Sequence, residues 1–268
     1  MTQTQMVQVG QANLECTIYG SGDALVLLAN AGCSTSYFDK FGQHLASTGL
    51  QIVAINMRGV GRSQGPLEWA TLHDLAADVA GVIKALGCGP AHVLGHAFGN
   101  RIARCLAADH PALVRKVILL AAGGLFGPPT PLGSAFRNTD EAKLSGPEGV
   151  TLGARWLSPA SDPCVLAPVE CWPKVHLAHL ATSQRTRVEN WWAAGTAWLL
   201  VIQGLDDEAA PPANGYALRD QLGERVQLVD IPRAGHFLVL EQPDAVVKAV
   251  GNFIHRGPIA PKQPPGQG

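Results

Sequence analysis

Three short segments of the chain each follow an apolar run directly, and two of them carry a residue suited to catalysis. They are Gly95-His96-Ala97-Phe98-Gly99, Gly204-Leu205-Asp206-Asp207 and Ala234-Gly235-His236-Phe237. A carboxylate can orient an imidazole, and the imidazole can then take the proton of a hydroxyl nucleophile as it attacks a carbonyl. Between the two glycines of the first segment, however, stands an alanine, which offers no attacking atom.

The glycines of the first segment are typical of a sharp turn from a strand into a helix. Such a turn lifts its central side chain above the sheet and brings the backbone so close to its neighbours that Gly95 and Gly99 have no room for side chains. The N-terminus of the helix that follows directs free N–H groups and a partial positive charge at the same place. The sequence therefore predicts a nucleophile elbow with Ala97 at the nucleophile position.

Apolar, β-branched runs bounded by turn residues predict eight strands. They lie at Met6–Val9, Glu15–Tyr19, Ala24–Ala29, Gln51–Asn56, Ala91–Gly95, Lys116–Ala121, Ala197–Gln203 and Val226–Ile231. Helical spacing of apolar residues predicts helices at Leu72–Leu86, Arg101–Asp109, Ala213–Leu222 and Pro243–Ile254. We therefore expect an α/β fold with a mostly parallel, doubly wound sheet. Asp74 and Asp78 are expected on the solvent face of their helix.

Residues 124–192 interrupt this alternation, because they are rich in proline and glycine and contain no clear strand. We expect them to form a helical cap over the carboxyl ends of the strands, where ligands bind in open α/β sheets. Residues 1–123 and 193–256 would then form the core. The Pro-, Gly- and Gln-rich residues 257–268 are expected to be a flexible tail.

The three segments together resemble the α/β-hydrolase family, and the resemblance extends over residues 5–255. It implies Ser-His-Asp chemistry in which Asp207, selected by the G-x-x-D spacing, is the acid and His236 is the base. The order nucleophile, acid, base along the chain is the one that this fold uses. His96, beside the nucleophile position, is expected to point into the structure.

The resemblance also implies an oxyanion hole built from two backbone N–H groups. One is that of Phe98, and the other belongs to the loop after the third predicted strand, at Ala31 or Gly32. This loop lacks the His-Gly pair common among relatives. A further segment, 56–63, resembles a structural turn of the family, with Asn in place of its leading Asp.

Ala97 leaves several interpretations open. The favoured one is a serine esterase or lactonase in an engineered, nearly inactive form that still binds its substrate, because a protein freed from catalysis has no physical reason to keep a costly buried Asp–His pair. The alternatives are a natural non-catalytic ligand-binding relative, water activated directly by His236 and Asp207, and Cys33 as a substitute nucleophile. C–C bond hydrolysis and cofactor-free oxygenation also remain open on this fold.

The cap has little clustered charge, which favours a neutral, fairly apolar ester or lactone as substrate. Its aromatic residues are expected mainly to pack the cap, with a pocket lining as the alternative: Phe126, Phe136, Trp156, Trp172, Trp191 and Trp192. His176 and His179 are expected at the cap surface or the pocket rim, since no third metal ligand is in view. No cofactor or metal is expected.

Composition narrows the classes of partner. The chain has 268 residues and a net charge of −1, which argues against a nucleic-acid partner. No apolar run approaches the roughly 20 residues that span a bilayer, and no signal peptide is visible, so a cytoplasmic protein with no membrane partner is expected. The six cysteines are expected to be buried thiols, with Cys164 and Cys171 pairing only if the protein is exported. A small molecule is the expected partner, and a homodimer is left open.

Overall fold

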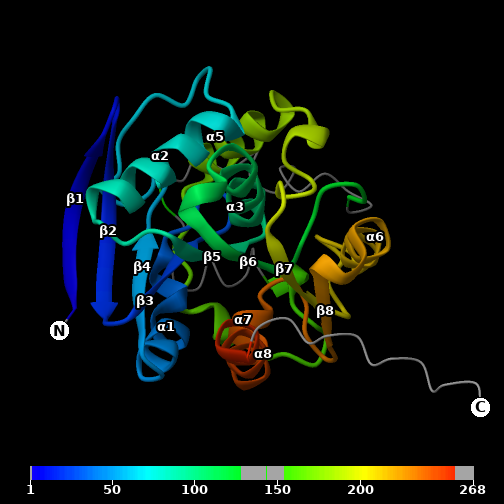
Figure 1. Ribbon diagram of the computed structural model, residues 1–268. Helices are drawn as coiled ribbons and strands as arrows, with labels where there is room; N and C mark the ends of the chain where they lie inside the picture. The colour runs from blue at the N-terminus through cyan, green and yellow to red at the C-terminus, as the bar shows by residue number, and fades with distance from the viewer. Residues whose placement is uncertain (1, 128–142, 144–153, 257–268) are drawn as a thin grey trace, which may run out of the picture.

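One mixed sheet of eight strands organises the chain in the computed structural model, which describes residues 2–127, 143 and 154–256 (Figure 1). The strands are β1 (Gln3–Val9), β2 (Ala12–Gly20), β3 (Asp23–Leu28), β4 (Leu50–Ile55), β5 (Ala91–His96), β6 (Val114–Leu120), β7 (Trp198–Gly204) and β8 (Val226–Ile231). Their order in the sheet is β1-β2-β4-β3-β5-β6-β7-β8. Strand β2 runs antiparallel to β1 and β4, and the remaining neighbours pair in parallel. The predicted strands and the mostly parallel sheet are confirmed.

Helices cover both faces of the sheet (Figure 1). On one face lie α2 (Leu72–Ala85), α3 (Phe98–Asp109) and α6 (Ala213–Leu222). On the other lie α1 (Asp39–Ala46), α7 (Leu238–Glu241) and α8 (Pro243–Arg256). The sequence did not predict α1, a two-turn helix with a glycine in its middle. Short 3-10 turns complete the core: η1 (Thr35–Phe38), η2 (Pro111–Leu113) and η7 (Gly223–Arg225).

Only part of the predicted cap is described. It contains η4 (Ala154–Trp156), η5 (Pro163–Leu166), α5 (Pro173–Gln184) and η6 (Val188–Asn190). In Figure 1, α5 lies beside α2 and α3. Phe136 and the predicted tail lie outside the described residues.

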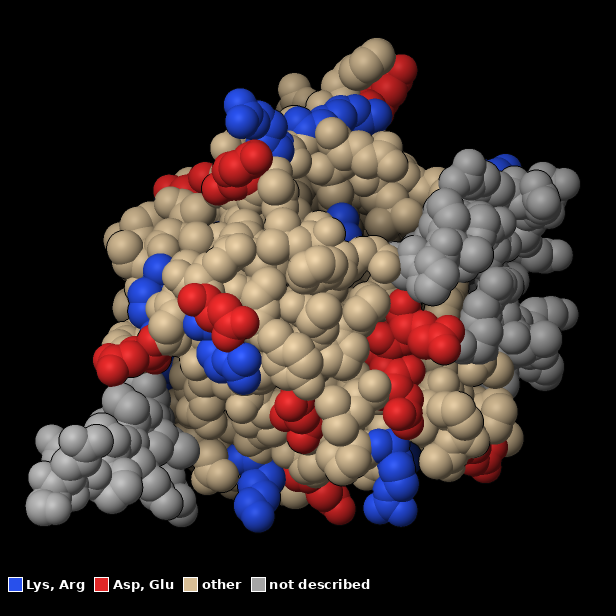
Figure 2. Space-filling view, turned by 90° about the vertical axis from the view of Figure 1, so that its right-hand side faces the viewer, with Lys and Arg blue, Asp and Glu red and all other residues tan. Residues whose placement is uncertain are grey.

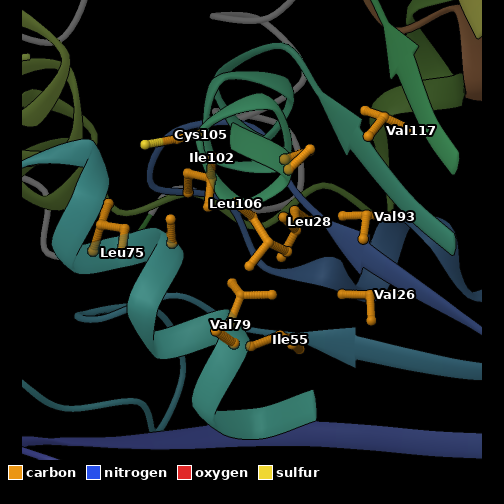
Figure 3. Close-up of a cluster of buried hydrophobic side chains, with 14 of the residues drawn as sticks. Val26, Leu28, Ile55, Leu75, Val79, Val93, Ile102, Cys105, Leu106 and Val117 are labelled. Carbon is orange, nitrogen blue, oxygen red and sulfur yellow. The ribbon is translucent and has the colours of Figure 1, made fainter. Parts of the chain in front are cut away.

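Apolar side chains between the sheet and two helices fix the position of α3 (Figure 3). Ile102 and Leu106 of α3 belong to one cluster with side chains of α2 and of the central strands, and all of them are fully buried: Leu75, Val79, Val26, Leu28, Val93 and Val117. Burial of each such side chain contributes on the order of 2 kcal/mol. Because α3 begins at the predicted elbow, this packing holds the elbow in place.

The prediction for Asp78 is wrong. Asp78 is buried, and both of its carboxylate oxygens accept hydrogen bonds from the Arg58 guanidinium, at 2.6 and 2.9 Å. Asp74 is exposed and caps the start of α2 through Thr71. A buried ion pair of this kind is costly to break from one side, because the remaining charge is left without a partner. The pair ties the turn after β4 to α2.

The prediction for the cysteines is also corrected. Cys33 and Cys171 form a disulfide, while Cys16, Cys88, Cys105 and Cys164 are free. The bond joins the loop after β3 to the segment before α5. Because its sulfur is already bonded, Cys33 is not available as a substitute nucleophile.

The helices and the surface charge can be compared with what a membrane or nucleic-acid partner would require. Among the described residues, no helix is both long and apolar enough to cross a membrane. On the face shown in Figure 2, basic and acidic side chains are interspersed and form no broad field of one sign.

Candidate active site

The turn between β5 and α3 has the geometry of a nucleophile elbow. Ala97 has φ 51° and ψ −107°, a strained conformation for a residue with a side chain. A Cβ on Gly95 would lie 2.3 Å from the carbonyl carbon of Gly99, and a Cβ on Gly99 would lie 2.3 Å from the Leu28 carbonyl oxygen. Both elbow positions therefore require glycine, and the strained backbone is held by its surroundings.

His236 and Asp207 meet at the carboxyl ends of β8 and β7. The Nδ1 atom of His236 lies 3.0 and 3.2 Å from the two carboxylate oxygens of Asp207, and both residues are buried. One of those oxygens also accepts hydrogen bonds from the backbone N–H groups of Ala209 and Ala210, at 2.8 Å each. These amides fix the carboxylate, so it can orient the imidazole with Nδ1 protonated.

Asp206, the neighbouring acid, is engaged elsewhere. Its carboxylate accepts a hydrogen bond from the Ser158 hydroxyl at 2.6 Å. The two adjacent acids thus differ in their partners, and only Asp207 contacts the histidine.

Two backbone N–H groups converge on one point beside the elbow. Those of Ala31 and Phe98 both donate to the side-chain oxygen of Asn30, at 2.7 and 3.5 Å. The Gly32 N–H instead donates to Nδ1 of His179, at 3.0 Å. The Asn30 oxygen therefore occupies the point on which these two N–H groups converge. The position of this oxygen could not be predicted from the sequence, because it depends on the rotamer of one side chain.

A buried chain of hydrogen bonds links this loop to the backbone of His236. The Asn30 N–H donates to the Tyr37 hydroxyl, which lies 2.8 Å from His96 Nδ1, and His96 Nε2 lies 2.7 Å from the His236 carbonyl oxygen. Burial lowers the pKa of His96 to about 3, so its neutral ring can accept at one nitrogen and donate at the other. His96 points into the structure, as expected, and joins the elbow to the backbone of His236.

His179 is buried and does not line the pocket, so the prediction that it lies at the cap surface or the pocket rim is wrong; His176 is buried as well, but it lines the pocket. His176 Nδ1 donates to the Ala31 carbonyl oxygen at 2.9 Å, and His179 Nε2 donates to the Arg58 carbonyl oxygen at 2.9 Å. The ring of His179 also stacks on that of Phe98, at 5.1 Å between centroids. Helix α5 thus holds the backbone that carries the two converging N–H groups.

These two histidines make the fold sensitive to acid. Burial lowers the pKa of each to about 4, from 6.5. Between about pH 6.5 and 4, the unfolded chain therefore binds more protons than the folded chain, and folding stability falls as the pH falls. We expect a loss on the order of 3 kcal/mol per histidine by pH 4. Urea unfolding at pH 7, 6, 5 and 4 would measure it.

His179→Gln gives the matched variant, since glutamine can replace both hydrogen bonds and does not titrate. It should flatten the pH dependence of the unfolding free energy, whereas His255→Gln, at an exposed position, should not. Equal pH dependence in the two variants would contradict the prediction.

A pocket opens at these groups. Its lining includes Ala97, His236, Asn30, Phe98, Arg101 and Trp156. The cap aromatics divide between the two expected roles. Phe126 and Trp156 line the pocket, whereas Trp191 and Trp192 are buried against the guanidinium of Arg104.

One group of side chains in the described residues could hold a metal ion. His73, Cys105 and Asp109 bring one ligand atom each within 4.8 Å of one another, between α2 and α3. Those atoms already bond to each other: His73 Nδ1 lies 2.7 Å from an Asp109 oxygen, and the Cys105 sulfur lies 3.5 Å from the same oxygen. The group contributes no residue to the pocket.

The sequence of the chain is similar to those of known proteins. Residues 24–153 match the family model for the alpha/beta hydrolase fold. A Mycobacterium tuberculosis protein, provisionally named a non-heme bromoperoxidase, is 28% identical over 90% of this chain and 97% of its own length.

Solved structures match over nearly the whole chain. The crystal structure of E-2-(acetamidomethylene)succinate hydrolase has a TM-score of 0.78 at 21% identity, covering 95% of this chain and 99% of its own. A thermophilic esterase from Thermogutta terrifontis has a TM-score of 0.77 at 21% identity, covering 96% and 100%. At this identity the likeness shows the fold alone. Together with the sheet order and the family model matched by residues 24–153, it shows that the chain has the α/β-hydrolase fold.

Proposed function

We propose that the pocket binds an ester or lactone as a serine hydrolase does, and that Ala97 prevents turnover through an acyl-enzyme. The observation that carries the proposal is the oriented His236–Asp207 pair beside two converging N–H groups and a strained elbow. The bound carbonyl oxygen would replace the Asn30 oxygen between Ala31 and Phe98. Nothing at residue 97 can then attack, so the ligand stays intact.

Several features support a hydrolase site from which only the nucleophilic oxygen is missing. The elbow has both glycines, and Ala97 is held in a strained conformation at φ 51°. Without a nucleophile at residue 97, this strain serves no purpose. Asp207 keeps two backbone donors that serve its contact with His236. These features are needed to position a nucleophile. They fit an engineered inactive form, and equally a natural relative that binds without turnover.

Binding of intact ligand tests this proposal. Isothermal titration of p-nitrophenyl esters and aryl lactones should give saturable binding, and chromatography should recover the ligand unhydrolysed. Leu180→Trp, which fills the pocket from α5, should abolish binding while circular dichroism shows an intact fold. The proposal would be wrong if no ester or lactone bound, or if Leu180→Trp bound as well as the parent.

Two substitutions of Asn30 should change the affinity for esters in opposite directions. Asn30→Ala frees the two N–H groups, so ester affinity should rise about ten-fold, since no hydrogen bond has to be broken first. Asn30→Asp places a carboxylate on the same donors, and these stronger charge-assisted bonds should lower the affinity. Titration calorimetry would measure both. If Asn30→Ala weakened binding, Asn30 would be a ligand-binding group rather than an occupant of the site.

A further inference from the structure

Arg101 places a positive charge in the pocket wall without an acidic partner. It lies on α3, four residues after Ala97 and so on the same face of the helix, and it lines the pocket with Ala97 and His236. Among the described residues, no carboxylate forms an ion pair with it. Among the described residues, its guanidinium lies over the Trp191 ring, 5.7 Å from the ring centroid.

The surroundings of Arg101 do not neutralise this charge. Arg104, one turn further along α3, is fully buried and adds a second guanidinium, whose hydrogen bonds go to the Asn100 carbonyl and side-chain oxygens and the Gly123 carbonyl oxygen. Burial lowers the pKa of both arginines, and the charge of Arg101 lowers that of Arg104 further. The folded chain therefore bears a desolvation cost that no acid among its described residues offsets.

Three acids close to His236 in the structure already have hydrogen-bond partners. Asp207 is bound to His236 and to two backbone N–H groups. Asp206 accepts from Ser158, and Glu241 accepts from the Ser158 and Gly235 N–H groups. The counter-charge for Arg101 must therefore come from outside this set of side chains.

We infer that the ligand of the pocket carries a carboxylate that pairs with Arg101. A guanidinium presents two parallel N–H donors that match a carboxylate, and such a pair is strong where water is excluded. Four residues of helix span about 6 Å, so the carboxylate lies about one helical turn from the carbonyl held at Ala97. This inference rests on the proposed function and replaces the expected neutral ligand with a carboxylate-bearing ester or lactone. The cap composition gave no sign of it, because Arg101 comes from the core.

A pair of ligands that differ only in charge tests the inference. 4-Acetoxybenzoate and its methyl ester share the acetyl ester and the ring, and titration calorimetry compares their affinities. The carboxylate should bind at least ten-fold tighter to the unaltered chain. Arg101→Gln should remove this preference, because it should lower the affinity for the carboxylate at least ten-fold more than the affinity for the methyl ester. Arg219→Gln, at an exposed arginine paired with Asp220, is the matched control and should behave as the parent.

Two results would overturn the inference. One is equal affinity for the two ligands, and the other is an equal loss for both in Arg101→Gln, which would give Arg101 a structural role. Benzoate, which has no ester, separates this test from that of the proposed function. If benzoate raises the melting temperature of the parent but not of Arg101→Gln, the anion site stands even where no ester binds. If benzoate affects both chains alike or neither, the anion site is refuted.

Discussion

Ala97→Ser is expected to raise hydrolysis of a p-nitrophenyl ester or aryl lactone by at least about a thousand-fold, because loss of a triad nucleophile costs on the order of a million-fold in turnover. The substitution adds one oxygen at a position whose backbone is already held in the required conformation. His236 would accept the proton of the new hydroxyl, and the Ala31 and Phe98 N–H groups would hold the oxyanion. Initial rates on an ester and lactone panel measure the gain.

Ala97→Gly is the control for this gain. Glycine relieves the strain at φ 51° without supplying an oxygen, so it should stay as inactive as the parent. If Ala97→Ser gained no activity on the whole panel, the site would bind without an intact catalytic arrangement. Activity in Ala97→Gly would mean that hydrolysis does not pass through residue 97.

The second large effect concerns the acid. In the Ala97→Ser background, Asp207→Asn should lower kcat about ten-thousand-fold, because an amide keeps the geometry but favours the wrong tautomer of the histidine. Asp206→Asn in the same background should change kcat only a few-fold, since its carboxylate contacts Ser158 and not His236. Steady-state rates of the two double variants make the comparison.

Asp206 and Asp207 are adjacent in the chain, so the two variants show which of the two carboxylates orients His236. Equal losses in both variants would show that the region acts as a whole and that neither carboxylate orients the base. A larger loss in Asp206→Asn would reverse the assignment. Circular dichroism of each variant excludes unfolding as the cause.

The sheet and the elbow could be predicted because their physical requirements leave local patterns. Strands covered on both faces are apolar along their length, as in β6 and β7, and all eight predicted strands are present. The elbow requires glycine at Gly95 and Gly99, where any Cβ would overlap backbone atoms. These requirements concern residues close together in the chain, so the sequence expresses them directly.

The missed features depend on contacts between distant segments. Asp78 has the spacing of a solvent-facing residue, and only the approach of Arg58 makes it buried. Cys33 and Cys171 are separated by 138 positions, and no spacing motif marks the pair. His179 binds the backbone of Gly32, which a local helical pattern cannot indicate.

The pocket electrostatics escaped prediction for a related reason. Arg101 stands in an amphipathic helix, where an arginine usually faces solvent. The fold instead turns it to the pocket, because α3 starts at the elbow and its first turns face the carboxyl ends of the strands. Asn30 likewise lies in a loop, and no local pattern indicates that its side-chain oxygen accepts hydrogen bonds from two backbone N–H groups.

A fluorophosphonate probe tests the central claim most directly, because it reacts covalently with a serine that is activated by a histidine and an oxyanion hole. The Ala97→Ser variant should gain one phosphonyl group by intact mass, and peptide mapping should place it on residue 97. The parent chain should stay unlabelled, as should Ala97→Ser combined with His236→Gln. An unlabelled Ala97→Ser variant, or labelling that persists without His236, would contradict the account.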